Sequence, residues 1–103
     1  MTLSSNLPLF VVSSFEREWR PGDINYLVLF EGKSQVSRAH PDVWQLTIRR
    51  SKQDKEKSAK YIFQKDGPHW VKAIGINNLP EDTERAFIPW AVAILAPPQP
   101  PET

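Results

Sequence analysis

Short apolar runs, separated by turn residues and polar stretches, make up most of the chain. In the clearest run, Val43 to Arg49, the apolar residues Trp44, Leu46 and Ile48 alternate with polar residues. Alternation with a period of two places one set of side chains on a single face of a strand. The segment 43–49 is therefore predicted to be a strand with one face in a core.

Four further runs have the same short length and the same enrichment in aromatic and β-branched residues, which favours strands. They span residues 9–15, 24–30, 59–64 and 69–74. The tetrapeptide Arg20–Asp23 has Pro and Gly at its central positions, which is the chemistry of a type II turn. Asp66 followed by Gly67 predicts a short hairpin, although Pro68 weakens the case for a tight two-residue turn.

The segment that follows these runs contains a helix start and then an ambiguous apolar stretch. Pro80 precedes a cluster of acidic residues, a pattern typical of a helix N-terminus, and we expect one or two turns that end near Phe87. Residues 90–95 are apolar at every position. Only seven residues separate Pro89 from Pro97, so we expect a strand buried on both faces rather than a helix.

Together these elements predict a mainly β protein. We expect a single small domain with an antiparallel sheet of about six strands that forms a small barrel or sandwich, with one short helix before the last strand. The 103 residues show no second composition regime, so one β-rich domain is assigned to residues 8–96. Residues 1–7 are predicted to be a flexible N-terminus, and residues 97–103 a disordered Pro-rich tail.

Composition removes several classes of function. The chain has no Cys, which excludes disulfides, thiolate metal sites and Cys nucleophiles. The glycines are isolated, no Ser stands in a Gly-x-Ser-x-Gly motif, and His40 and His69 lack partners at metal-ligand spacing. The longest apolar run, residues 86–96, is shorter than the ~20 residues of a membrane span. We therefore expect a cytoplasmic non-enzyme without cofactor, metal or membrane partner.

The net charge of +1 hides a strong asymmetry along the chain. Residues 49–72 hold eight basic and three acidic residues, a net charge of +5, so the rest of the chain carries −4. A basic hairpin whose strands carry Tyr61, Phe63 and Trp70 has the lysines and rings that bind single-stranded nucleic acid. The opposing interpretation is a solvated loop with its rings in the core. Nucleic-acid binding is one alternative function, and a small metal-free nuclease centred on His69 is a second.

Trp19 lies among charged residues, and large aromatic residues of this kind are enriched at protein interfaces. Because no motif assembles a catalytic site, we favour a non-enzymatic accessory, adaptor or inhibitor protein that binds a larger protein or protein complex. The candidate partner-binding residues are Arg17, Trp19, Arg20, Arg49, Arg50, Lys52, Lys55, Lys57, Lys60, Trp70 and Lys72.

Overall fold

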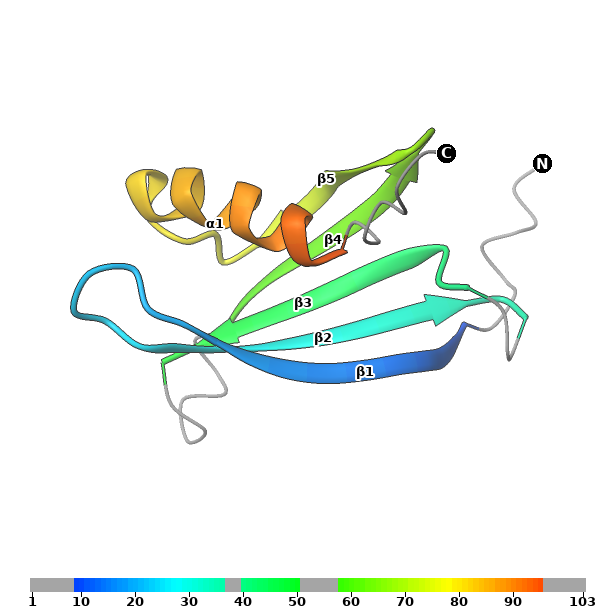
Figure 1. The fold of residues 1–103 in the computed structure, drawn as a ribbon, viewed down its shortest axis with the longest axis horizontal. Coiled ribbons are helices and arrows are strands. Elements are labelled where there is room, and N and C mark those ends of the chain that lie inside the picture. Colours follow the sequence, from blue (N-terminus) through cyan, green and yellow to red (C-terminus); the bar gives the residue numbers. More distant parts are fainter. Residues whose placement is uncertain (1–8, 37–39, 51–57, 96–103) are drawn as a thin grey trace, which may run out of the picture.

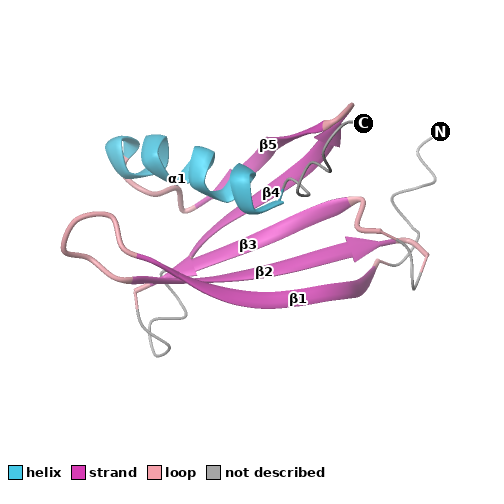
Figure 2. Ribbon diagram, viewed as in Figure 1, coloured by secondary structure: helices cyan, strands magenta, loops and turns pink. Residues whose placement is uncertain are grey.

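Five antiparallel strands form one sheet, and a helix lies across one face of it (Figure 1). This computed structural model describes residues 9–36, 40–50 and 58–95, so the predicted N-terminal segment 1–7 and tail 97–103 lie outside the described residues. The elements are β1 (Phe10–Trp19), β2 (Tyr26–Ser34), β3 (Val43–Arg49), β4 (Ala59–Asp66), β5 (His69–Ile76) and α1 (Glu81–Leu95). Each strand pairs with its chain neighbour, and α1 forms the second layer (Figure 2).

The five strands that alternation and composition predicted are confirmed, and β3 has the expected bounds. Gly22 has a φ of 71°, the positive value that the third position of a type II turn requires. Gly67 has a φ of 62° between the paired residues Asp66 and His69, so the hairpin does close with two residues. Pro68 is tolerated because it occupies the second central position, outside the strand ladder.

The predicted last strand is wrong, because residues 90–95 belong to α1. The helix continues through Pro89, which lacks the N–H that would bond to the carbonyl of Arg85. Pro89 and Arg85 are both exposed, so this missing bond falls on the solvent side of the helix. The proline therefore interrupts the hydrogen bonding of α1 without disturbing the side that packs on the sheet.

The buried side of α1 explains why helix prevails over strand. Phe87, Ala91 and Leu95 are buried, whereas Pro89 and Ala93 between them are exposed. A strand would place all five residues on the same face, so this pattern of burial fits a helix and not a strand. The ring centre of Phe87 lies 5.6 Å from that of Tyr61 in β4, and the ring centre of Trp90 lies 5.9 Å from that of Phe30 in β2. α1 thus packs on aromatic residues from several strands at once.

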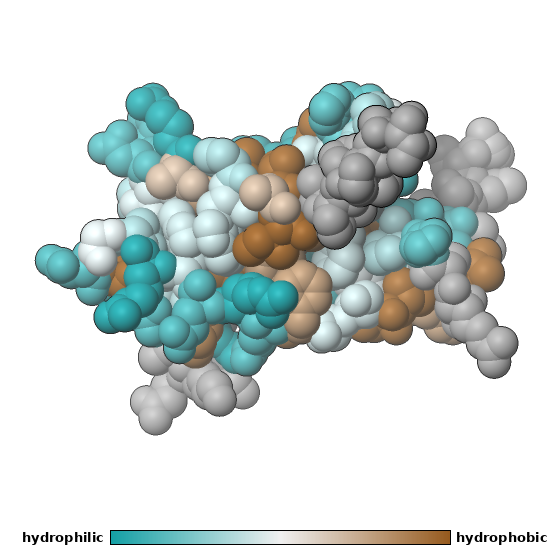
Figure 3. All heavy atoms as spheres, viewed as in Figure 1, coloured by the Kyte–Doolittle hydropathy of each residue, from teal (hydrophilic) through white to brown (hydrophobic). Residues whose placement is uncertain are grey.

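The expectation of a closed barrel or a sandwich is also corrected: the sheet is open, with β1 and β5 as its edges. A sheet needs a second layer for its apolar face, and α1 supplies that layer in place of a second sheet. In Figure 3, hydrophobic surface remains in the middle of the view, over the C-terminal end of α1, and further hydrophobic surface lies toward the right end. The buried side chains on the sheet under α1 include Tyr26, Val28, Phe30, Trp44, Leu46, Ile48, Tyr61 and Phe63.

Replacing Pro89 with Ala tests whether α1 is continuous. We expect Pro89→Ala to stabilise the protein by about 1–2 kcal/mol, because an interior proline costs a helix about 3 kcal/mol and the freer unfolded chain offsets about 1 kcal/mol. Urea unfolding followed by circular dichroism measures the change. Ala93→Pro, at an exposed position of the same helix, is the control and should be destabilising. No gain in stability for Pro89→Ala would contradict a continuous helix.

Candidate functional site

No described element covers the face of the sheet opposite α1, which we call the helix-free face. Strand residues alternate between the two faces, and the register identifies those that share this one. Leu29 pairs with Glu16 on one side and with Thr47 on the other, and Thr47 pairs with Lys60. Aliphatic side chains on this face include Leu27, Leu29, Ile62, Val71, Ile74 and Ile76.

The first five residues of β2, Tyr26–Phe30, are apolar on both faces of the strand. Tyr26, Val28 and Phe30 are buried under α1, whereas Leu27 and Leu29 are half-buried on the helix-free face. An antiparallel sheet with one solvated face normally shows alternation between apolar and polar residues. A strand that is apolar on both faces is typical of a sheet covered on both sides. The helix-free face is therefore the leading candidate for a functional surface.

Charged side chains of both signs lie among the aliphatic side chains of this face. The guanidinium of Arg49 lies 4.0 Å from the carboxylate of Glu16, and this ion pair reaches across β2. Lys33 donates a hydrogen bond to Oε1 of Gln45 at 3.1 Å. The cations Lys33, Arg49 and Lys60 share the face with the carboxylates of Glu16, Glu18 and Glu31. The helix-free face therefore has no excess of positive charge.

The two tryptophans among the sequence candidates lie in the core. Trp19 is 7% exposed; its ring centre lies 5.4 Å from that of Tyr26, and it meets Phe87 of α1 edge-on at 5.2 Å. Trp70 is also 7% exposed. Little of either ring is left for a partner. The charges around Trp19 suggested exposure because its cover, α1, comes from a distant part of the chain.

The candidate basic residues that the structure describes are not brought together in one patch. Arg49 and Lys60 lie on the helix-free face, whereas Lys72 lies on the side of α1, where it binds a glutamate of the helix. The described residues of 49–72 thus contribute charge to both faces. Of the other candidates, Arg17, Arg20 and Arg50 are exposed, and Lys52, Lys55 and Lys57 lie outside the described residues.

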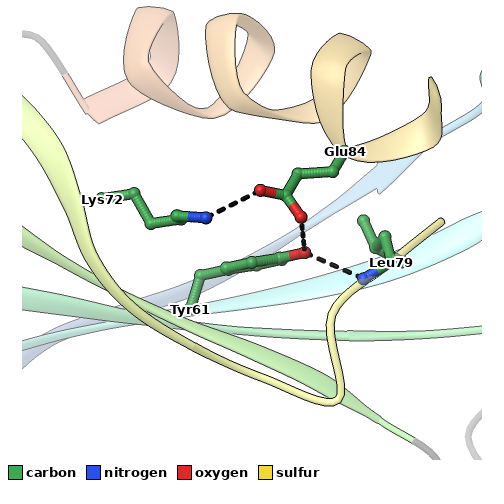
Figure 4. A network of polar contacts seen from close by, with 4 residues as sticks. All are labelled: Tyr61, Lys72, Leu79 and Glu84. Carbon is green, nitrogen blue, oxygen red and sulfur yellow. Dashed lines mark hydrogen bonds and ion pairs between the residues drawn. The ribbon is translucent and has the colours of Figure 1, made fainter. Parts of the chain in front are cut away.

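A polar network connects α1 to the sheet on the covered face (Figure 4). The hydroxyl of Tyr61 accepts a hydrogen bond from the backbone N–H of Leu79 at 2.9 Å and donates one to Oε1 of Glu84 at 3.0 Å. Nζ of Lys72 donates to Oε2 of Glu84 at 2.7 Å. The network joins β4, β5 and the segment before α1 to the first turns of the helix. Its geometry fixes where α1 begins.

The protonation of this network suits a structural connection. Burial, reinforced by the hydrogen bond to Glu84, raises the pKa of Tyr61 to about 12. The hydrogen bond from Lys72 lowers the pKa of Glu84 below its usual value. At neutral pH the phenol therefore stays protonated and the carboxylate stays charged. Neither group has a pKa near neutrality, which general acid–base catalysis favours.

Gly75 leaves the space that the ring of Tyr61 occupies. The two residues pair across β4 and β5, and a Cβ at position 75 would lie 2.9 Å from Cε1 of Tyr61 and 2.5 Å from Oδ1 of Asn78. A side chain at this position would therefore displace Tyr61 or Asn78. A glycine inside a strand often marks such a close approach, and this signal in the sequence was not used to predict the network.

The part of the chain that the structure describes contains no group of three or more His, Asp or Glu residues arranged to hold a metal ion. Within the same residues, α1 is too short to cross a membrane. Comparisons with protein-family models, with curated proteins and with solved structures found no match. The geometry of the helix-free face is therefore the basis for the functional proposal.

The lowered pKa of Glu84 predicts a loss of stability on the acid side. Because this pKa is lower in the folded protein than in the unfolded chain, its contribution is present above the usual glutamate pKa and is lost as the pH falls through the folded value. We expect Glu84→Gln to be less stable than the wild type at pH 7 and the difference to shrink in acid. Urea unfolding across this pH range measures it; a difference independent of pH would contradict the assignment.

The raised pKa of Tyr61 predicts a loss of stability at alkaline pH. A phenol whose pKa rises from 10.0 to about 12 on folding contributes stability below pH 10 that is lost as the pH rises toward 12. At neutral pH, Tyr61→Phe should cost about 1–3 kcal/mol, because the N–H of Leu79 loses its acceptor. The difference from the wild type should narrow above pH 10 in the same unfolding assay. A difference in stability between the wild type and Tyr61→Phe that stays constant to pH 12 would contradict this role of Tyr61.

Proposed function

We propose that this protein is a non-enzymatic accessory protein, an adaptor or inhibitor, that binds a larger protein through the helix-free face. One observation carries the proposal: the segment Tyr26–Phe30 of β2 is apolar on both faces, but α1 covers only one of them. Leu27 and Leu29 of β2 and Ile62 of β4, which we call the aliphatic centre, lie on the uncovered side. The polar residues Gln45 and Thr47 of β3 lie between them. Burial of this centre against a partner removes apolar surface from water, which favours association.

The composition of the helix-free face supports a protein as the partner. Protein interfaces combine an apolar centre, depleted in charge, with a polar rim. Here Glu16 and Glu18 of β1 pair with Leu29 and Leu27, and Lys60 of β4 pairs with Thr47, so charged side chains flank the aliphatic residues. Charges of both signs in a rim favour one orientation of a complementary partner, and they contribute to specificity more than to affinity.

Single-stranded nucleic acid is supported less well than a protein as the partner of this chain. The rings of Tyr61, Phe63 and Trp70, the proposed stacking surface of the basic segment, are buried in the core. The described part of the helix-free face carries no Phe, Tyr or Trp, and its cations are balanced by carboxylates. Base stacking and phosphate neutralisation are the two terms that such binding requires. The nuclease alternative depends on His69, which is exposed beside the β4–β5 turn and outside the aliphatic centre.

A charge placed at the centre of the helix-free face tests the proposal. Leu29→Lys should leave the protein folded, because the aliphatic part of a lysine can lie along the sheet with its ammonium in water. We expect it to weaken partner capture by at least about tenfold, since the charge loses solvent on binding. The assay compares capture from the native lysate by immobilised wild type, by Leu29→Lys and by the control Ala93→Lys, which changes an exposed position of α1.

The supporting result is a protein that the wild type and Ala93→Lys retain and Leu29→Lys loses. Equal capture by all three would contradict a role for the helix-free face. The same columns are also loaded with single-stranded DNA. Retention near 150 mM salt, with a steep loss as salt rises, would favour the nucleic-acid alternative instead.

A further inference from the structure

The two edges of the sheet differ in chemistry. β1 carries the consecutive charged residues Glu16, Arg17 and Glu18 along its exposed length. β5 carries no charged side chain on the helix-free face between Val71 and Ile76. The aliphatic residues there are well exposed: Val71, Ile74 and Ile76 are 42%, 53% and 52% exposed.

Natural proteins protect exposed edge strands, because unpaired backbone N–H and C=O groups attract another strand. Charged side chains are one such protection, and β1 has them. The one lysine in the middle of β5, Lys72, is turned toward α1 and paired with Glu84 at 2.7 Å, so it does not protect the outer edge. In the described part of the chain, β5 pairs with β4 alone.

An irregularity in β5 concentrates its aliphatic residues on one face. Ile62 pairs with Ile74 and Phe63 pairs with Lys72, so Ala73 is an extra residue in the strand. A bulge of this kind changes which face the following side chains occupy. Here it places Val71 on the same side as Ile74, and it turns Lys72 to the other side. The result is an apolar row beside an open edge.

We propose that β5 pairs antiparallel with β5 of a second copy of this chain, which joins the two five-stranded sheets into one. A strand that pairs antiparallel with itself satisfies the requirement of a two-fold interface, in which the same surface serves both partners. The apolar row of one copy then meets that of the other, and cross-strand aliphatic contacts of this type stabilise a sheet.

Charge favours a second copy as the occupant of this edge. Two identical edges that carried a net charge would repel each other, but the helix-free side of β5 is uncharged from Val71 to Ile76, and the charge of Lys72 is neutralised by Glu84. A β1–β1 pair would instead bring two charged strands together. Of the two edges, β5 is therefore the one suited to self-association.

This inference goes beyond the proposed function. A two-fold axis perpendicular to the sheet keeps both helices on one side and both helix-free faces on the other. The dimer would therefore present two copies of the partner surface on one continuous sheet. Avidity from two sites exceeds the affinity of one without any new contact.

Sedimentation equilibrium of the full chain, over about 1 μM to 1 mM, tests the dimer. We expect the wild type to approach twice the mass of one chain as concentration rises. Ile74→Lys should remain monomeric at concentrations where the wild type is dimeric, because it places two like charges at the junction. Val11→Lys is the matched control: Val11 is also 53% exposed, but on β1, and this variant should dimerise as the wild type does.

Amide hydrogen exchange of the wild type, measured at the lowest and the highest of these concentrations, tests the β5 contact without a variant. Protection that increases with concentration in β5, and does not change in β1, would support the proposal. A wild type that stays monomeric throughout would overturn it, as would protection confined to the other strands or an Ile74→Lys variant that still dimerises. Leu29→Lys should dimerise normally, so loss of partner binding and loss of dimerisation are distinguishable.

Discussion

The packing of α1 on the sheet through Phe87 and Trp90 is the contact on which the rest of the structure depends. Both rings insert among aromatic residues from different strands, and both pack against the ring of Trp19 in β1. Aromatic rings bring large apolar areas into such a cluster and also favour specific edge-on and stacked geometries. Because one helix faces a sheet with two sides, the same contact also decides which side remains open.

The polar network complements this packing. Tyr61 lies in the core, yet its hydroxyl reaches Leu79 and Glu84 at the start of α1. Apolar burial alone is non-directional and would tolerate a helix that slides along the sheet. Hydrogen bonds with defined donors and acceptors fix its position, and the raised pKa of Tyr61 keeps the phenol a donor throughout the physiological pH range.

The strands could be predicted from the sequence because alternation is a local property. Val43 to Arg49 shows its buried and exposed faces without reference to any other segment. The C-terminal helix could not be assigned in the same way. Pro89 is a local signal against a helix, whereas the signal in favour, the spacing of Phe87, Ala91 and Leu95, has its effect only when a sheet is present to bury them.

The candidate site also combines features that are local in the sequence with features that depend on tertiary structure. Trp19 and Trp70 were selected by their sequence neighbours, but their burial depends on residues far away in the chain. The better signal was the uninterrupted apolar run from Tyr26 to Phe30, which is unusual for a sheet with one wet face. The apolar run indicates a binding surface only once it is known which face α1 covers, and only the tertiary structure shows that.

The order of the strands has a consequence for how the chain folds. Each strand pairs with its neighbour in sequence, so every hairpin closes a short loop, and such local pairings form quickly. α1 follows all five strands and therefore leaves the ribosome after them. Until it does, Phe30, Trp44 and Tyr61 are not covered by α1, and the nascent sheet exposes its aromatic face. The interval between synthesis of β5 and docking of α1 is thus the period of greatest exposure to aggregation, when a chaperone that binds aromatic surface would act.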